Sequence, residues 1–132
     1  MPADLVLDLS ATTSGLHECL DRIEQSCAGW NLPRATVARL LIVVEELYSN
    51  TIKHGHGGEC GGPVRLRLRS QPGIELVYED EAPPFDPTAW QPPDGGAQLV
   101  VGQKGIALIV GLAASARYER LPHGNRMTLG FA

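Results

Sequence analysis

The chain has 132 residues, of which 43% are hydrophobic, 20% charged and 5% aromatic. This size and content suit one hydrophobic core but hardly two, so we expect a single domain over residues 1–132. The formal net charge of −4 argues against direct nucleic-acid binding, which normally uses a basic patch. Neither a membrane-length apolar run nor a secretory leader is visible, so we expect a cytoplasmic protein without a membrane partner.

The cysteine and histidine content favours a reduced protein. Cys19, Cys27 and Cys60 are an odd number of thiols with no close pair, so a disulfide framework is not expected. His54, His56 and Cys60 lie near one another in the sequence, but their spacing fits no zinc pattern and no fourth ligand is evident. We therefore do not expect a structural zinc site.

The first part of the chain predicts a strand followed by two helices. Leucines alternate with other residues over 5–9, which indicates a short strand. Hydroxyl side chains within 10–14 are suitable N-caps for a following helix with apolar residues at helical spacing. That helix is interrupted at Gly29. A second helix begins near Pro33 and is predicted to run to about Lys53, before a glycine-rich segment ends it.

The second part of the chain predicts two hairpins separated by a loop and a helix. Each hairpin alternates apolar and polar residues on either side of a short turn. The predicted ranges are 64–69 and 74–78 for the first hairpin, 82–102 for the loop, 105–114 for the helix, and 116–121 and 126–131 for the second hairpin. Strands joined by short turns pair antiparallel. The element order therefore predicts an α/β (α+β) two-layer sandwich, with a mixed, mostly antiparallel sheet covered by helices on one face.

The second helix carries polar groups within an otherwise apolar pattern. Glu46, Asn50 and His54 are each four residues apart, so they lie along one helical face. A carboxylate can accept a proton, and an amide oxygen is a hard ligand that suits Mg²⁺. Alternatively, this is a solvated face whose histidine interacts with the negative end of the helix dipole. The helix by itself leaves both interpretations open.

Two further segments have features of a ligand site. Asp80 ends an apolar strand, where its carboxylate could accept a hydrogen bond from an adenine amino group or simply begin a turn. Residues 102–105 read Gly-Gln-Lys-Gly at a predicted helix start, where free N–H groups and the helix dipole suit phosphate oxygens. An ordinary glycine turn has the same pattern. No Gly-Lys-Ser/Thr occurs, which excludes a Walker-type loop.

Taken together, the chain resembles the histidine-kinase-like ATPase superfamily, which has the Bergerat fold, and within it the small anti-sigma factor serine/threonine kinases. Three ordered stretches carry the resemblance: residues 46–55, with Glu-Leu-x-x-Asn-x-x-x-His-Gly; residues 80–87, with Asp-x-x-x-Pro-Phe-Asp-Pro; and residues 102–108, with Gly-x-x-Gly-Ile-x-Leu. The closing hairpin over 118–129 is also similar. The resemblance covers nearly the whole chain.

This resemblance implies roles for individual residues. Glu46 would be the general base that activates the attacking hydroxyl, and Asn50 the ligand of a Mg²⁺ ion that bridges the ATP phosphates. Lys53 would contact phosphate, and Asp80 would bind the adenine amino group. Further implied nucleotide-binding positions are Ala82, Phe85, Gly102, Lys104, Gly105, Ile106 and Thr128, of which Lys104 and Gly105 would form the end of a lid over the phosphates. Glu45 points about 100° away from Glu46 on the helix, so it receives no catalytic role.

The chain also departs from the family pattern at two places. Ala82 stands where family members usually carry a glycine that lets the backbone approach the base, and its methyl group is expected to weaken adenine binding. Residues 102–107 contain fewer glycines than the third family motif usually has, which is expected to reduce lid flexibility. Both departures bear on kinase activity more than on the fold.

The resemblance implies an ATP-binding anti-sigma regulatory factor. Such a protein would sequester a sigma factor or similar client and use serine/threonine kinase activity to phosphorylate an anti-anti-sigma antagonist protein. The alternative is a catalytically weak or inactive nucleotide-binding partner-switch module that acts by binding alone. A third interpretation, the ATPase half of a split sensor histidine kinase, is disfavoured because no helix offers a phospho-accepting histidine in a dimerisation context. Related regulators are often dimers, so a homodimer remains an open alternative.

Overall fold

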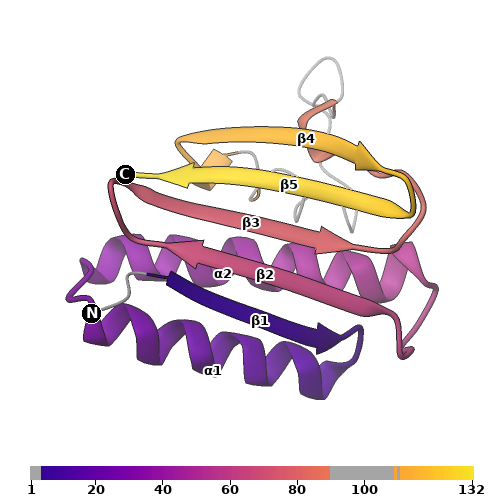
Figure 1. Ribbon diagram of the computed structural model, residues 1–132, viewed down its shortest axis with the longest axis horizontal. Helices are drawn as coiled ribbons and strands as arrows, with labels where there is room; N and C mark the ends of the chain where they lie inside the picture. The colour runs from indigo at the N-terminus through magenta and orange to yellow at the C-terminus, as the bar shows by residue number, and fades with distance from the viewer. Residues whose placement is uncertain (1–3, 90–108, 110) are drawn as a thin grey trace, which may run out of the picture.

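A computed structural model describes residues 4–89, 109 and 111–132 of the chain (Figure 1). The elements, in order, are β1 (Asp4–Ser10), α1 (Thr13–Gly29), α2 (Arg34–Asn50), a π-helical turn (Thr51–Gly55), β2 (Pro63–Arg69), β3 (Ile74–Asp80), a 3₁₀ turn (Pro87–Ala89), β4 (Ser115–Leu121) and β5 (Gly124–Phe131). Within these ranges, no helix combines the length and hydropathy that are needed to cross a membrane.

The strands form one sheet in the order β1-β2-β3-β5-β4, and each neighbouring pair is antiparallel. Figure 1 shows α1 and α2 side by side on the same face of this sheet. The predicted α+β two-layer architecture is therefore confirmed. The described strand pairs contain no parallel pair, so the sheet is simpler than the mixed sheet that the sequence analysis allowed.

The core lies between the helices and the inner face of the sheet. Side chains that point inward along each strand are apolar, because successive residues of a strand face opposite sides. They pack against the buried stripe of each helix, and burial of this apolar surface is the main stabilising term. Fully or almost fully buried members are Leu7, Ile23, Leu40, Val43, Val44, Val64, Leu66, Leu68, Leu76, Ile109 and Leu129.

Local signals explain the helix boundaries. Thr12 is the N-cap of α1, and its side-chain oxygen accepts a hydrogen bond from the Gly15 N–H at 3.0 Å. The regular part of α2 ends at Asn50, three residues earlier than predicted, because the chain continues as a π-helical turn. In that turn the His56 N–H donates to the Thr51 carbonyl oxygen at 3.0 Å. Such widened turns occur frequently at functional sites.

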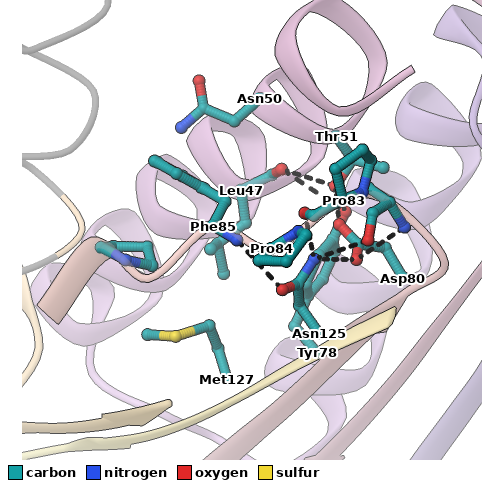
Figure 2. Close-up of a pocket in the computed structure, with 12 residues that line it drawn as sticks. Leu47, Asn50, Thr51, Tyr78, Asp80, Pro83, Pro84, Phe85, Asn125 and Met127 are labelled. Carbon is teal, nitrogen blue, oxygen red and sulfur yellow. Dashed lines mark hydrogen bonds between the residues drawn. The ribbon is translucent and has the colours of Figure 1, made fainter. Parts of the chain in front are cut away.

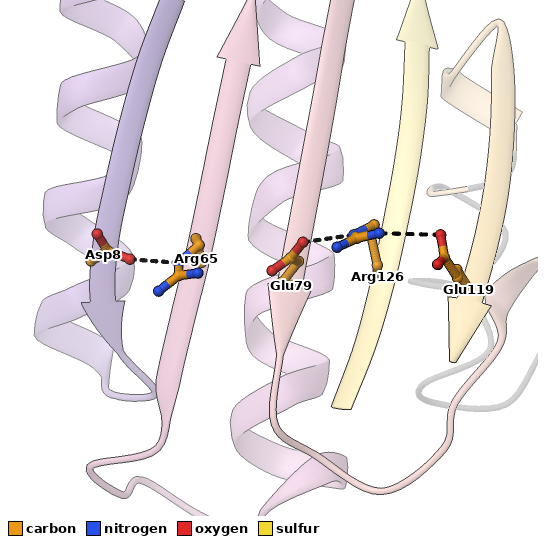
Figure 3. Close-up of polar contacts among 5 residues, drawn as sticks. All are labelled: Asp8, Arg65, Glu79, Glu119 and Arg126. Atoms are coloured by element: carbon orange, nitrogen blue, oxygen red, sulfur yellow. Dashed lines mark hydrogen bonds and ion pairs between the residues drawn. The ribbon is translucent and has the colours of Figure 1, made fainter. Parts of the chain in front are cut away.

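The outer face of the sheet carries charged residues in place of a second helical layer. One row across the strands alternates in sign, and Figure 3 shows its ion pairs. Arg65 pairs with Asp8 at 2.8 Å, and Arg126 pairs with Glu79 at 2.6 Å and with Glu119 at 3.2 Å. Asp8 and Arg65 are largely exposed, so their pair adds little stability, whereas Arg126 and Glu79 are partly buried. The alternation of apolar and polar residues that was predicted over 64–69 is confirmed.

The second hairpin also matches its prediction, with β4 and β5 joined at Leu121 and Gly124. Half of the helix predicted over 105–114 falls outside the described residues, as does the part of the predicted loop from residue 90 to 102. Ile109 is described, and its side chain is completely buried in the core.

Gly124 is required by a close approach between β5 and the end of β3. A Cβ atom at this position would lie 1.7 Å from the Asp80 carbonyl oxygen and 2.9 Å from the Glu81 Cα. Both neighbours are backbone atoms, so they cannot move aside as a flexible side chain could. The absence of a side chain at Gly124 therefore allows β5 to start beside Asp80.

We predict that Gly124→Ala lowers the free energy of unfolding by about 3 kcal/mol, the scale of a severe overpacking error. Urea unfolding followed by circular dichroism measures this change. Gly73→Ala is the matched control, because no atom lies within 4 Å of the Cβ it would add, and it should alter stability by less than about 0.5 kcal/mol. Equal stability of the two variants would contradict the close approach.

The three thiols are free and differ in their surroundings. Burial raises the pKa of Cys19 to about 12 and that of Cys27 to about 11. Cys60 is only partly buried, in the segment before β2. Since the thiolate is the reactive form, we predict that maleimide at pH 8 labels one thiol rapidly and the other two only after unfolding. Mass spectrometry identifies the labelled residue. In Cys60→Ser the rapid phase should disappear, and its persistence would contradict this prediction.

Candidate functional site

A pocket opens between the end of α2, the inner face of the sheet and the loop that follows β3 (Figure 2). Including the space open to solvent it spans about 620 Å³. Its lining is mostly apolar with a few convergent polar groups. The lining residues are Leu47, Asn50, Thr51, Tyr78, Asp80, Ala82, Pro83, Pro84, Phe85, Pro87, Asn125 and Met127.

The carboxylate of Asp80 is the acidic group in this lining. Its Oδ1 accepts hydrogen bonds from the Asn125 side-chain amide at 2.9 Å and from the Ala82 N–H at 3.3 Å. Its Oδ2 accepts a hydrogen bond from the Thr51 hydroxyl at 2.8 Å. These donors come from the sheet, the loop and the helical layer, so three separate parts of the chain hold the carboxylate in place.

Asn125, at the start of β5, connects this carboxylate to the loop that closes the pocket. Its amide nitrogen also lies 3.0 Å from the Pro83 carbonyl oxygen, and its Oδ1 accepts a hydrogen bond from the Phe85 N–H at 3.1 Å. The Tyr118 hydroxyl donates to the same Oδ1 from the neighbouring strand β4. Asn125 thus fixes one wall of the pocket with respect to the sheet.

Tyr78 lies behind Asp80 on β3 and is almost fully buried. Its hydroxyl is 2.6 Å from the Thr51 hydroxyl. Burial is the main reason that the pKa of Tyr78 is raised well above its usual value, and the nearby Asp80 carboxylate adds to the increase. The phenol therefore remains neutral and can act as a hydrogen-bond donor.

Asn50 lies in a different part of the pocket from the Thr51–Asp80 cluster (Figure 2). Its side chain is only 8% exposed, and its amide nitrogen has no hydrogen-bond partner among the described residues. Buried polar groups are nearly always paired, so an amide that lines a pocket without a partner among the described residues is available to a ligand. An amide is also a suitable group for contact with a Mg²⁺ ion or its waters.

The described residues contain no group of three or more His, Cys, Asp and Glu side chains that could hold a metal ion. A Mg²⁺ ion at this site would thus depend on Asn50, on water and on phosphate oxygens of a bound nucleotide. This arrangement suits Mg²⁺, which keeps several waters and is commonly bound through one or two protein groups together with substrate phosphates. The residues present therefore fit this ion.

A protein-family model described as the histidine kinase-like ATPase domain matches residues 9–131. The chain belongs to this family. The predicted superfamily is thereby confirmed, and the match covers both the pocket and the helix that carries Asn50. No curated protein matches the chain significantly.

Two solved structures resemble the fold of this ATPase domain. The RsbU and RsbW domains of Rv1364c from Mycobacterium tuberculosis share 17% identity with it, at a TM-score of 0.68 over 97% of this chain and 32% of that one. The histidine kinase domain of the Erythrobacter litoralis EL346 blue-light activated histidine kinase shares 20% identity, at a TM-score of 0.55 over 92% of this chain and 63% of that one. The chain thus spans about a third of the length of the first structure and just under two thirds of the length of the second.

Four of the residues proposed from the sequence of this ATPase domain line the pocket: Asn50, Asp80, Ala82 and Phe85. Ala82 is buried, whereas the Phe85 side chain is 38% exposed. The other proposed residues of α2 and the turn after it are outside the lining. Glu46 is half-buried, one helical turn before Asn50, and Lys53 is exposed on the π-helical turn.

Thr128 requires a correction, because the structure does not bring it to the pocket. On β5, Asn125, Met127 and Leu129 are buried toward the helices, and the alternation of a strand turns Thr128 to the outer face. There it lies in a surface groove with Arg117 of β4. The remaining proposed positions, Gly102, Lys104, Gly105 and Ile106, lie outside the described residues.

The sequence analysis missed three polar pocket residues, namely Thr51, Tyr78 and Asn125. Tyr78 could have been found, because it is two residues before Asp80 on the inner face of β3. Thr51 and Asn125 carry no comparable signal. They reach Asp80 only because the fold joins positions 29 and 45 residues apart in the sequence.

Proposed function

We propose that this ATPase domain binds Mg²⁺-ATP and acts as an anti-sigma regulatory factor with serine/threonine kinase activity. The observation that carries the proposal is the presence of two polar groups in one apolar pocket, a fixed carboxylate at Asp80 and an amide at Asn50 whose nitrogen has no partner among the described residues. A carboxylate suits the amino group of a base, and the amide suits the phosphate and metal end of a nucleotide.

In this mechanism the chain orients the nucleotide from both ends. Asp80 accepts a hydrogen bond from the adenine amino group, while the apolar walls around Leu47 and Met127 cover the base and exclude water. Asn50 would hold Mg²⁺, and the bound ion would neutralise charge on the phosphate oxygens. Lys53 would add a positive charge near the phosphates from its exposed position.

Glu46 is the proposed general base. It would accept the proton from a serine or threonine hydroxyl of the antagonist as that oxygen bonds to the γ-phosphorus. The bond between the γ-phosphorus and the bridging oxygen would break, and ADP would leave with the electron pair. Glu46 lies one helical turn before Asn50, and the i, i+4 spacing puts both residues on the same face of α2.

The regulatory part of the proposal concerns two protein partners. The domain would sequester a sigma factor or similar client in one state and phosphorylate an anti-anti-sigma antagonist protein in another. A phosphoryl group adds roughly two negative charges, which can disrupt a docking surface. The similarity in fold to a structure that contains RsbU and RsbW domains supports this choice among the functions of the family. The same proposal places the protein in the cytoplasm and includes a homodimer of this chain.

A binding module without catalysis is the second candidate. Ala82 favours it, because a buried methyl group at the pocket occupies space that glycine would leave open. The position of Glu46 outside the pocket lining also favours it. In this alternative the nucleotide would control partner binding, and no phosphoryl group would be transferred.

We predict that Asp80→Asn and Asn50→Ala both weaken Mg²⁺-ATP binding by about tenfold to a hundredfold, the scale of a lost hydrogen bond to a charged group. Isothermal titration calorimetry measures this change. Asp21→Asn is the matched control, since this exposed carboxylate on α1 is remote from the pocket, and its affinity should equal that of the unmodified protein. Unchanged affinity in Asp80→Asn would contradict the base site, and no binding of ATP at millimolar concentration would overturn the nucleotide proposal.

We predict that Glu46→Gln lowers the rate of ATP hydrolysis by about a hundredfold or more without a comparable change in ATP affinity, as expected when a general base is lost. Release of ADP during prolonged incubation with Mg²⁺-ATP provides the measurement. The neighbouring, exposed Glu45 supplies the control, and Glu45→Gln should hydrolyse ATP at the unmodified rate. Equal rates for Glu46→Gln and Glu45→Gln would remove the base assignment.

A further inference from the structure

The Thr51 hydroxyl lies among three oxygen atoms at the wall of the pocket. It is 2.8 Å from Asp80 Oδ2, 2.6 Å from the Tyr78 hydroxyl and 3.1 Å from the Leu47 carbonyl oxygen (Figure 2). Thr51 is only 3% exposed. The hydroxyl has one proton to donate, so its surroundings decide which oxygen receives that proton.

The neighbouring groups direct this proton to Asp80. The Leu47 carbonyl oxygen already accepts a hydrogen bond from the Thr51 backbone N–H. Tyr78 remains protonated because it is buried, and its hydroxyl can donate to the Thr51 oxygen. Among the three oxygens, the Asp80 carboxylate is the strongest acceptor, because hydrogen bonds to an ionised group are about twice as strong as neutral ones. The chain of donors therefore runs from Tyr78 through Thr51 to Asp80.

Counting acceptor positions shows what the carboxylate has left for a ligand. An ionised carboxylate has about four lone-pair positions. Among the described residues, Asn125 and Ala82 donate to Oδ1, and Thr51 donates to Oδ2. The one lone-pair position that receives no hydrogen bond from these donors is on Oδ2, the oxygen to which Thr51 also donates. The Thr51 hydroxyl thus restrains the oxygen available to a bound base.

We propose that Thr51 is a positioning residue of the base subsite, and that its hydroxyl holds Asp80 so that Oδ2 receives the exocyclic amino group of a 6-aminopurine. The inference rests on the proposed nucleotide binding and adds a specificity role for a residue that does not itself contact the base. Orientation by a fixed donor avoids the cost of ordering the carboxylate when the ligand binds.

The test compares ATP with purine riboside 5′-triphosphate, which lacks the 6-amino group. Calorimetry with Mg²⁺ gives the dissociation constants of both nucleotides for the unmodified protein, Thr51→Val and Thr51→Ser. We expect ATP to bind about tenfold or more tightly than the analogue in the unmodified protein. In Thr51→Val, which keeps the side-chain shape but loses the donor, this ratio should fall to about threefold or less. Thr51→Ser, which retains the hydroxyl, should restore most of the ratio.

A merely structural role of Thr51 predicts a different result, because a distorted pocket would weaken both nucleotides by the same factor. An unchanged or larger ratio in Thr51→Val would therefore overturn the inference, as would a ratio near one in the unmodified protein. Either result would leave nucleotide binding intact. Failure of the unmodified protein to bind ATP at all would instead overturn the proposed function together with this inference.

A second variant keeps the test valid if Thr51→Val does not fold, as judged by near-ultraviolet circular dichroism. Tyr78→Phe removes the donor to Thr51, which frees the threonine to reorient, and the ratio should again fall. Tyr48→Phe is its control, because the hydroxyl of this buried tyrosine donates to the Ser10 carbonyl oxygen and Tyr48 is not part of the pocket lining. An unchanged ratio in Tyr78→Phe would overturn the inference, and so would an equal fall in both tyrosine variants.

Discussion

The hydrogen bond between Thr51 and Asp80 is the interaction on which the geometry of the pocket depends, because it joins the helical layer to the sheet. A partly buried carboxylate is stabilised by hydrogen bonds, so it favours a conformation that supplies them. Here the donors belong to the turn after α2, to the start of β5 and to the loop after β3. A displacement of any one of these segments would leave the charge less well compensated. The pocket is therefore held in shape by the acidic group that it would use to bind a ligand.

The sequence was sufficient to predict the order of the helices and strands, but it missed the π-helical turn after α2 and predicted only part of the site. Alternation is unambiguous in β2, where Arg65 and Arg67 separate buried residues, and the Thr12 cap was among the hydroxyl residues proposed for α1. Asp80 was found because it ends a strand. The role of Thr51 was not accessible, because it depends on contacts between distant parts of the chain. The position of Thr128 could have been predicted from the sequence. Its neighbour Leu129 is apolar, and adjacent residues of a strand point to opposite faces of the sheet.

The two candidate functions share their binding residues and differ in chemistry. In both proposals, recognition of a nucleotide would rely on Asp80, Asn50 and the apolar walls, all of which belong to the pocket lining. Phosphoryl transfer needs in addition a base and an acceptor hydroxyl, and the hydroxyl would come from another protein. Membership of the histidine kinase-like ATPase family is consistent with either function. Whether the protein is an enzyme or a nucleotide-dependent switch thus depends on Glu46 and on whether an acceptor hydroxyl of another protein comes close to it.

The alternating charges on the outer face of the sheet also have a consequence for how the protein meets other molecules. The carboxylates of Asp8, Glu79 and Glu119 are already neutralised by arginines of adjacent strands (Figure 3). A protein that covered this row would have to remove water from several ions and would find their charges already satisfied, which makes the contact costly and weakly directional. The row of ion pairs therefore makes this face of the sheet an unfavourable surface for protein binding. Recognition is left to the edges of the sheet, the helices and the segments around the pocket.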